Sequence, residues 1–381
     1  MSLKLFSFAQ EWKESRRFES LDISERSIVF YAENKASKNH FKLLISELTE
    51  KMNLQICYVT SVKDDPIFET KNENIKPFYI GDGAARTKFF LTLKAKILIM
   101  DMPDLETFHI KRSKVYPVHY VYLFHSMFSI HSYLRKGAID NYDTIFCVGP
   151  HHVKEIIETE KTYGLKSKIL VKYGFGRLDT LLDERKKFDK TNSDNLVLIT
   201  PSYGKNNLLE ACGLNLIDIL LKSNFKVLLR PHFRILKESP KLINRIIKKF
   251  ENNPNFFFEE GIISKELFQN SLCLISDWSG ISFEYAFTFN RHVIFIDVPK
   301  KILNPNYKDI DLEPIEISIR EKIGKIFSPD DLEKIPIFIE SIEDGNSVAS
   351  NEIEKICLET VYNIGQSAKI GAAYIKELNN K

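Results

Sequence analysis

Residues 276–285 have the sequence Ser276-Asp277-Trp278-Ser279-Gly280-Ile281-Ser282-Phe283-Glu284-Tyr285, which is typical of a junction between a strand and a helix. The apolar run 272–275 before it predicts a buried strand, and the apolar periodicity of 281–289 predicts a helix. The first N–H groups of a helix have no partner within it, and with the helix dipole they favour an anion above the strand. Ser279 and Ser282 add hydroxyl donors, and Gly280 lets a phosphate approach the backbone. The junction predicts a phosphate site, with an ordinary N-cap at Ser279 as the alternative.

The same alternation of strands and helices occurs twice along the chain. The expected strands of the first series are 28–31, 54–59, 78–80, 97–100, 120–124, 144–148 and 169–173. Those of the second series are 196–199, 226–229, 256–258, 272–275 and 292–296, and helix-period segments lie between them. Such alternation is typical of parallel sheets covered by helices. It predicts an α/β fold of two doubly wound Rossmann-like domains facing a cleft, with ligands at the carboxyl ends of the strands.

The expected domain limits follow from this pattern and from the polar linker candidate 183–195. Residues 1–190 should form an N-terminal Rossmann-like domain and residues 191–352 a second one. The last segment, 353–381, is expected to be a helix that packs back on the first domain.

Composition excludes several classes of protein. With 381 residues and 44% hydrophobic content the chain can fill two cores, and a net charge of +3 gives no nucleic-acid footprint. Basic runs such as Lys300-Lys301 are expected to be solvated. The five cysteines lie far apart, so neither a zinc site nor a disulfide framework is indicated, and a reducing cytosol is the natural setting. No run reaches the ~20 apolar residues of a membrane span. An apolar face within 3–18 could lie on a membrane surface or pack on the protein itself.

Polar residues follow several expected strands and are candidates for a site. They are His125 and Ser126, then Ser202, Tyr203 and Lys205, and Gly174, Gly176, Arg177 and Asp179. Arg230-Pro231-His232-Phe233-Arg234 places potential cations close together, and they repel one another unless an anion is present. Guanidinium binds phosphate bidentately, so this segment predicts a phosphate contact. Glu284 could reach ribose hydroxyls, with a solvent-exposed glutamate as the alternative; a lone histidine such as His125 could equally be a core or surface residue.

The usual rival motifs do not occur. The chain has no G-x-x-x-x-G-K-[ST] loop, no G-x-G-x-x-G after the first strand, no H-E-x-x-H and no G-x-S-x-G. The acidic pairs Asp64-Asp65 and Asp330-Asp331 lack metal-ligand spacing. No cofactor is therefore implied, and a divalent metal stays open without support.

Taken together, these segments resemble the CDP-glycerol glycerophosphotransferases, the teichoic-acid primases and polymerases of GT-B architecture. The family's Asp-Tyr-Ser-Ser and following Asp-Tyr are similar to 277–280 and Glu284-Tyr285, and its Arg-x-His-Pro is similar to 230–233. Its Gly-x-Pro-Arg-x-Asp is similar to 174–179, its His-Gly to His125-Ser126, and its Pro-Thr-Trp-Arg to 201–204. The resemblance covers roughly 120–300.

The resemblance implies a transferase that moves glycerol-phosphate or a similar polyol-phosphate from a CDP-activated donor to a hydroxyl of a lipid-linked or polysaccharide acceptor. The product would be a cell-surface polymer such as teichoic acid or capsule, made in the cytoplasm, with the inner face of the cell membrane as a possible site of action. The resemblance also implies that the first domain binds the acceptor and the second binds the donor. His125 and His232 would be catalytic. The donor phosphates would be held among Arg230, Ser202, Lys205, Asp277, Ser279, Gly280, Ser282, Glu284, Gly174 and Arg177.

Three alternatives remain open. A GT-B glycosyltransferase using a nucleotide sugar, a sugar-nucleotide epimerase and a non-catalytic binding protein all suit the same architecture. Gly280, Ser126, Gly204 and Phe233 differ from the family's residues, so the donor could be CDP-glycerol, CDP-ribitol or another cytidine-linked compound.

Overall fold

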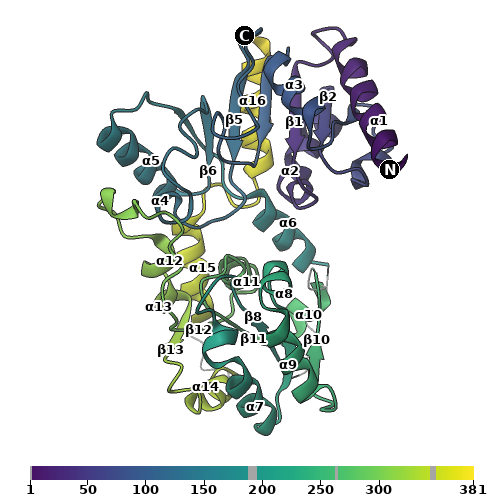
Figure 1. The fold of residues 1–381 in the computed structure, drawn as a ribbon. Coiled ribbons are helices and arrows are strands. Elements are labelled where there is room, and N and C mark those ends of the chain that lie inside the picture. Colours follow the sequence, from purple (N-terminus) through teal and green to yellow (C-terminus); the bar gives the residue numbers. More distant parts are fainter. Residues whose placement is uncertain (1, 188–194, 262–264, 344–348) are drawn as a thin grey trace. The chain divides into compact units, whose positions relative to one another are not determined.

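The computed structural model describes residues 2–187, 195–261, 265–343 and 349–381. Contacts divide the chain into unit 1 (Met1–Thr180, Asn304–Leu312 and Thr360–Lys381) and unit 2 (Leu181–Leu303 and Glu313–Glu359). Each unit contains one parallel sheet with helices packed on it, which confirms the predicted α/β fold (Figure 1). The expected boundary at residues 190 and 191 lies outside the described residues. The linker candidate 183–195 begins within a helix, because α6 (Gly176–Arg185) ends only at Arg185.

The sheet of unit 1 has the strand order β3-β2-β1-β4-β5-β6-β7, and every pair is parallel. Its strands are β1 (Ile28–Ala32), β2 (Ile56–Thr60), β3 (Ile75–Tyr79), β4 (Ile97–Met100), β5 (His119–Leu123), β6 (Thr144–Cys147) and β7 (Ile169–Lys172). The order of connection reverses between β1 and β4. Ligand crevices of doubly wound sheets open at such a reversal, beyond the carboxyl ends of the strands.

Helices cover both faces of this sheet because alternate strand residues point to opposite sides. Phe30, Ile99 and Val121 belong to the face that packs on α2 (Ser37–Ser46), which continues as a π-helical turn, Glu47–Lys51. The other α-helices of this unit are α1 (Ser2–Glu19), α3 (Ala84–Thr92), α4 (Ile130–Tyr133), α5 (Pro150–Tyr163), the beginning of α6 and α16 (Ser367–Asn380). Two short 3₁₀ helices, Pro66–Glu69 and Tyr307–Asp309, also belong to it.

The N-terminal helix packs on its own unit. Helix α1 contacts β3 and α3, and the ring of Phe18 lies edge-on to Phe78 and Phe89. Of the two expectations for this segment, packing on the protein itself is therefore seen for its C-terminal half. None of the helices in the described ranges is both long and apolar enough to cross a membrane.

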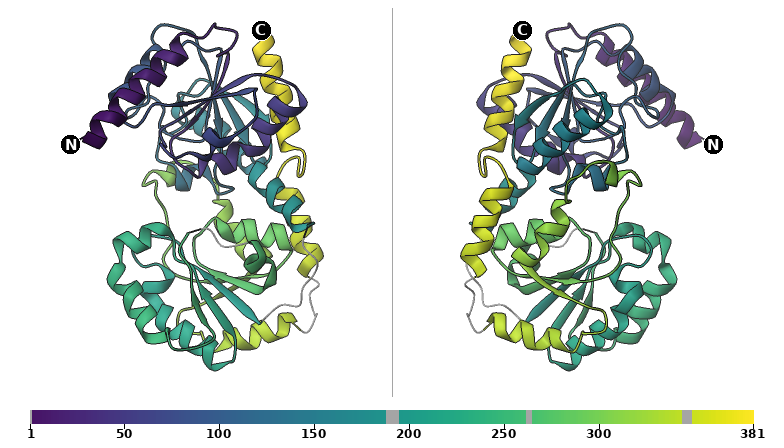
Figure 2. Two further views of the ribbon diagram at one scale, coloured as in Figure 1. Left: turned by 90° about the vertical axis from the view of Figure 1, so that its right-hand side faces the viewer. Right: turned by 90° about the vertical axis from the view of Figure 1, so that its left-hand side faces the viewer.

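The C-terminal segment forms two helices where a single one was expected. Helix α15 (Ala349–Thr360) ends before a turn in which Asn363 and Gly365 adopt positive φ angles of 47° and 74°. A left-handed residue stops a helix, so a new one, α16, begins at Ser367. Helix α16 contacts α2 and β4 of unit 1, and it is the yellow helix beside that unit in both views of Figure 2.

Unit 2 repeats the arrangement with the strand order β10-β9-β8-β11-β12-β13. Its strands are β8 (Leu196–Thr200), β9 (Lys226–Leu229), β10 (Phe256–Phe258), β11 (Ser271–Ser276), β12 (Val293–Ile296) and β13 (Gly324–Phe327). The order reverses between β8 and β11. Strand β13 was not expected from the sequence, because four residues at a sheet edge show too little alternation to mark a strand.

Three helices of unit 2 share one core with a face of the sheet. Val197, Ile199 and Ile275 face α7 (Leu214–Lys222), α9 (Pro240–Phe250) and α14 (Lys334–Glu343). The remaining elements are the π-helical turn Leu209–Gly213, α8 (Phe233–Glu238), α10 (Lys265–Asn270), α11 (Ile281–Phe289), α12 (Ile315–Ser318), α13 (Arg320–Ile323) and α15. This core supports the loops at the carboxyl ends of β8 and β11, where the candidate site lies.

Candidate active site

The carboxylate of Asp277 forms hydrogen bonds with both loops at the strand reversal of unit 2. Its side chain is buried, with 1% of its surface exposed. It accepts hydrogen bonds from the backbone N–H groups of Ser202 at 2.6 Å, Leu208 at 3.0 Å and Trp278 at 2.8 Å. Both carboxylate oxygens have these partners, so the role seen for Asp277 is to brace the loops after β8 and β11.

These loops border an open pocket of about 360 Å³. The side chains that line it include cations and aromatic rings, and among the described lining residues there is no carboxylate. They comprise Lys205, Arg234, Lys300 and Lys301, with Tyr203, Trp278, Ser202 and Asn207 among the others. An excess of positive charge in a concave site favours a ligand with several negative charges.

Two of these cationic side chains lie against the ring of Tyr203. The Nζ of Lys301 lies 3.2 Å from the ring centroid and the Cζ of Arg234 lies 4.2 Å from it. The imidazole of His232 is also close, with 4.6 Å between ring centroids. Cation–π attraction holds the two cations beside the ring without neutralising them. Their charges remain available to an anion, although Arg234 also pairs with Glu238 at 2.7 Å.

His232 is oriented by the start of α8. Its Nδ1 accepts a hydrogen bond from the N–H of Arg234 at 3.2 Å, which makes His232 the N-cap of this helix. The neutral ring therefore carries its proton on Nε2. Burial lowers the pKa of His232 to about 4, with further lowering by Lys301, Arg230 and Arg234. At neutral pH this imidazole is uncharged, and its Nε2–H is able to donate a hydrogen bond.

Lys301 is the residue of this pocket that sequence reasoning missed, because the run Lys300-Lys301 was expected to be solvated. Burial lowers the pKa of Lys301 to about 8, and the charge of Asp277 opposes this shift. Its position in the chain, shortly after β12, was the one available signal, since loops beyond the carboxyl ends of strands form the sites of such folds.

A serine at the N-terminus of α11, Ser279, is available to bind a ligand. Gly280 is the N-cap residue, with no side-chain cap, and the Oγ of the half-buried Ser279 has no hydrogen-bond partner in the described parts of the chain. The N-cap alternative for Ser279 is thus not observed. The Oγ of Ser282 is committed, since it donates to the carbonyl of Ser279 at 2.7 Å. Glu284 is half-buried in the first turn of the helix.

The remaining candidates of unit 2 differ in exposure. Arg230 is half-buried after β9, and its Nε donates to the carbonyl of Gly261 at 2.5 Å. Lys205 is exposed and lines the pocket. Arg230 is not among the residues that line the pocket, but its charge acts on His232.

Gly174 and Arg177 belong to unit 1 and do not line this pocket. Gly174 has a φ of 105°, and a Cβ there would lie 2.3 Å from the carbonyl oxygen of Tyr362. Asp179, in the helix α6 that follows Gly174, accepts hydrogen bonds from the N–H groups of Gly365 at 2.6 Å and Ser367 at 3.1 Å. The contacts seen for this element fasten the turn before α16, and Arg177 is half-buried beside it.

His125 follows β5 in unit 1. Its Nδ1 donates to the main-chain carbonyl of Asp101 at 3.1 Å, so the neutral ring presents Nε2 as a hydrogen-bond acceptor. Burial lowers the pKa of His125, and the neighbouring His40 lowers it further. This histidine is therefore uncharged at neutral pH and able to take up a proton, the state that a general base requires.

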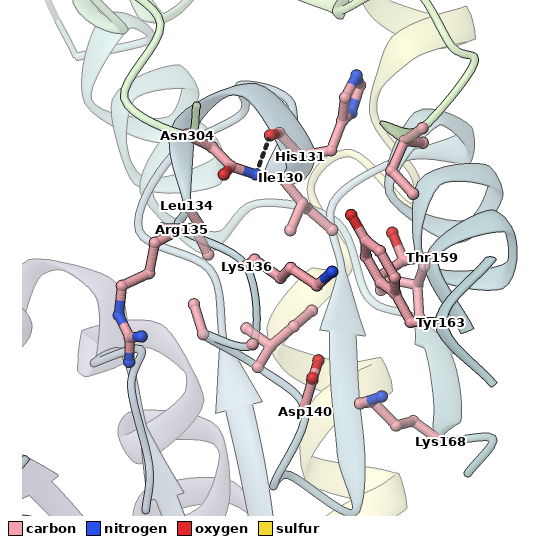
Figure 3. A pocket seen from close by; sticks show the side chains of 15 residues that line it. Ile130, His131, Leu134, Arg135, Lys136, Asp140, Thr159, Tyr163, Lys168 and Asn304 are labelled. Carbon is pink, nitrogen blue, oxygen red and sulfur yellow. Dashed lines mark hydrogen bonds between the residues drawn. The ribbon is translucent and has the colours of Figure 1, made fainter. Parts of the chain in front are cut away.

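A second hollow in unit 1 carries none of the predicted residues (Figure 3). Its Lys136 lies with Nζ 3.6 Å from the ring centroid of Tyr163, and Asn304 Nδ2 donates to the carbonyl of His131 at 2.8 Å. The internal space is about 30 Å³. This space admits no more than a few water molecules, so the hollow is too small for a nucleotide. Within the described ranges no group of three or more His, Cys, Asp and Glu side chains could hold a metal ion.

Comparison with known proteins agrees with this geometry. A sequence model of the family described as CDP-glycerol:poly(glycerophosphate) glycerophosphotransferase matches residues 15–300. A sequence search against curated proteins gives no match. The wall teichoic acid polymerase TagF has a similar structure, with 13% identity and a TM-score of 0.60 over 99% of this chain and 96% of that one.

Two epimerase structures are similar in fold as well. A putative UDP-N-acetylglucosamine 2-epimerase from Listeria monocytogenes has 12% identity and a TM-score of 0.60, over 92% of this chain and 96% of that chain. UDP-GlcNAc 2-epimerase from Methanocaldococcus jannaschii has 13% identity and a TM-score of 0.59, over 93% of this chain and 99% of that chain. At these identities the structural likeness shows the fold, which is GT-B, while the family match rests on sequence.

Proposed function

This chain belongs to the CDP-glycerol:poly(glycerophosphate) glycerophosphotransferase family, and we propose that His125 serves as its general base and the cationic pocket of unit 2 as its donor site. Membership makes it a transferase of cell-wall polymer synthesis. The donor proposed for it is CDP-glycerol. The observation that carries the assignment of the donor site is the pocket of about 360 Å³ with its four cations, Lys205, Arg234, Lys300 and Lys301.

The proposed reaction is a displacement at phosphorus. The oxygen of an acceptor hydroxyl bonds to the donor phosphorus that carries the polyol, and the bond from this phosphorus to the bridging oxygen breaks. CMP leaves with the bonding electrons, and the proton of the hydroxyl passes to Nε2 of His125. Such transfers depend mainly on positioning and on neutralising charge.

Each part of the unit 2 site has a proposed role in holding the donor. Lys301 and Arg234, gathered at Tyr203, neutralise the diphosphate. The Oγ of Ser279 and the first N–H groups of α11 bind a phosphate oxygen. The Nε2–H of His232 donates to the leaving phosphate, where a neutral donor stabilises the charge that develops.

The acceptor is proposed to be a lipid-linked or polysaccharide chain with a free hydroxyl, met at the inner face of the cell membrane. Support comes from the family and from the exposed ring of Phe8, 52% of whose surface is accessible on α1. Vesicle flotation of the wild-type protein and of Phe8→Ser tests the membrane part of this proposal.

We expect Ser279→Ala to weaken donor binding about 10-fold, the effect of one hydrogen bond to a charged group. The substitution removes only an Oγ that has no partner in the described ranges, so the melting temperature should stay unchanged. Calorimetric titration with CDP-glycerol measures the effect, and Ser341→Ala, at an exposed serine of α14, is the matched control. Equal donor affinity in a folded Ser279→Ala protein would show that this serine does not touch the donor.

Donor affinity should fall as the pH rises through about 8, the pKa of Lys301. Below this value Lys301 is cationic and attracts the diphosphate, and above it the charge is lost. The donor itself does not titrate in this range, because a diphosphate diester is fully ionised at neutral pH. Lys301→Met should weaken binding at pH 7 by roughly tenfold and remove the pH dependence.

Titrations of CDP-glycerol between pH 6.5 and 9 measure this effect. Lys300→Met is the control, since Lys300 is exposed and lines the same pocket. A Lys301→Met protein that keeps the wild-type slope with pH would assign the titration to another group.

The transfer itself is tested by incubating the protein with CDP-glycerol, CDP-ribitol or a UDP-linked sugar, with and without a polymer acceptor, and measuring CMP release. The proposal expects CMP to appear with a CDP-linked polyol only when acceptor is present. A nucleotide sugar as the sole effective donor would point to glycosyl transfer, and epimer formation without added acceptor would point to an epimerase.

A further inference from the structure

A second histidine, His40, stands beside the proposed base in unit 1. The ring centroids of His40 and His125 are 6.1 Å apart. His40 comes from α2, which follows β1, and His125 follows β5, so the fold brings together residues far apart in the chain. The His40 side chain is half-buried, with 12% of its surface exposed.

Asp101 binds both rings, by two different groups. Its carboxylate accepts from His40 Nδ1 at 2.7 Å through Oδ2 and from Ser37 Oγ at 3.0 Å through Oδ1. Its main-chain carbonyl accepts from His125 Nδ1 at 3.1 Å. Asp101 directly follows β4, at the strand reversal of this sheet, and 7% of its surface is exposed.

In this arrangement both imidazole rings turn the same nitrogen, Nδ1, toward Asp101. Each uses Nδ1 to bond Asp101, so each leaves Nε2 as the nitrogen that can meet a substrate. Because the carbonyl of Asp101 belongs to the backbone, the orientation of His125 does not depend on the charge of the Asp101 side chain. The charge and the orientation can therefore be changed separately.

Resting on the proposed function, we propose that His40 and Asp101 are positioning residues for the base His125. Asp101 holds the His125 ring through its carbonyl, and the hydrogen-bonded pair of His40 and Asp101 beside this ring sets the proton affinity of His125. A base so placed stays unprotonated between turnovers and still accepts the proton of the attacking hydroxyl.

The electrostatics of the neighbourhood agree with this geometry. Burial lowers the pKa of His125 most, the charge of His40 lowers it further, and the charge and the carbonyl of Asp101 raise it. The other groups nearby are Glu33, which follows β1 and pairs with Arg86 of α3 at 3.2 Å, and Tyr133 of α4, whose ring centroid is 6.2 Å from that of His125. Burial raises the pKa of Glu33.

The test compares His40→Gln with Asp101→Asn in the full chain. Removing a positive neighbour makes His125 easier to protonate, so His40→Gln should raise the pKa of His125. Removing a negative neighbour has the opposite effect, so Asp101→Asn should lower it while the backbone carbonyl stays in place. Charges about 6 Å apart in a partly wet site shift a pKa by about one unit, so the two variants should differ by about two.

Two measurements follow the shift. NMR titration of labelled histidine in the protein without substrate reports the pKa of His125 directly, with His125→Gln to assign its signal. The pH profile of kcat/KM should move in parallel, because activity is lost as His125 becomes protonated on the acidic side. His119→Gln is the matched control, since His119 lies in the same sheet and bonds Thr144 instead of Asp101.

The outcomes separate this inference from the proposed function. Opposite shifts in His40→Gln and Asp101→Asn support the inference, whereas unchanged or same-direction shifts overturn it. His40→Asn replaces His40→Gln if the latter does not fold. The NMR titration needs no turnover, so a wild-type protein that releases no CMP would reject the transferase assignment while the titration still decides the electrostatic role.

Discussion

His125→Gln should reduce the turnover number by about a hundredfold or more while CDP-glycerol binds with nearly wild-type affinity, as expected for a lost general base. The ring is prepared for proton transfer, because Nδ1 bonds the carbonyl of Asp101 and the pKa of His125 is lowered by burial and by His40. Nε2 is therefore unprotonated at neutral pH.

Steady-state rates of CMP release and calorimetric titration of the donor separate the two effects. Activity of the wild-type enzyme should also fall at acidic pH, since protonated His125 cannot accept the proton of the acceptor, and this limb should be missing from the residual activity of the variant. His119→Gln serves again as the control. A His125→Gln enzyme with wild-type turnover would remove His125 from the mechanism.

His232→Asn should lower turnover about a hundredfold and donor affinity by several-fold, because it removes the neutral Nε2–H proposed to donate to the leaving phosphate. Asparagine is the informative substitution. His232 caps α8 by accepting the N–H of Arg234, and an asparagine side chain supplies the same cap. The variant thus loses the ring and keeps the helix.

His232→Ala is the companion variant, since it loses both the ring and the cap and should also melt earlier. Melting temperatures distinguish the two proteins, and stopped assays of CMP release compare their turnover. Because the pKa of His232 lies at about 4, its contribution should not change between pH 6 and 8. If His232→Asn retained full turnover, the cation cluster alone would account for the stabilisation of the leaving group.

The order of the strands in the two sheets also explains where the candidate site residues lie. In each, the strand order reverses once, between β1 and β4 in unit 1 and between β8 and β11 in unit 2. Asp101 directly follows β4 and Asp277 directly follows β11. Both are buried carboxylates that bond neighbouring elements, so at each reversal an acidic residue organises the groups around it.

Local patterns were sufficient for much of this protein. Apolar runs located all but one of the described strands, because the side-chain period of a strand is a property of neighbouring residues. The segments 276–285 and 230–234 indicated an anion site for the same reason: a serine at a helix start and a crowd of cations are visible without knowing their partners. The place of His125 after β5 made it a candidate, and its role as general base stays a prediction.

Contacts between distant residues required the tertiary structure. Three sets of contacts join elements that only the strand order brings together. They are the cation–π contact of Lys301 with Tyr203, the bonds of Asp277 to the loop after β8, and the bonds of Asp101 to His40 and His125. The same holds for Gly174, whose fit against Tyr362 depends on the turn before α16. Periodicity reports which face of an element is buried, but which elements are neighbours depends on the packing of the whole sheet, and no local pattern contains it.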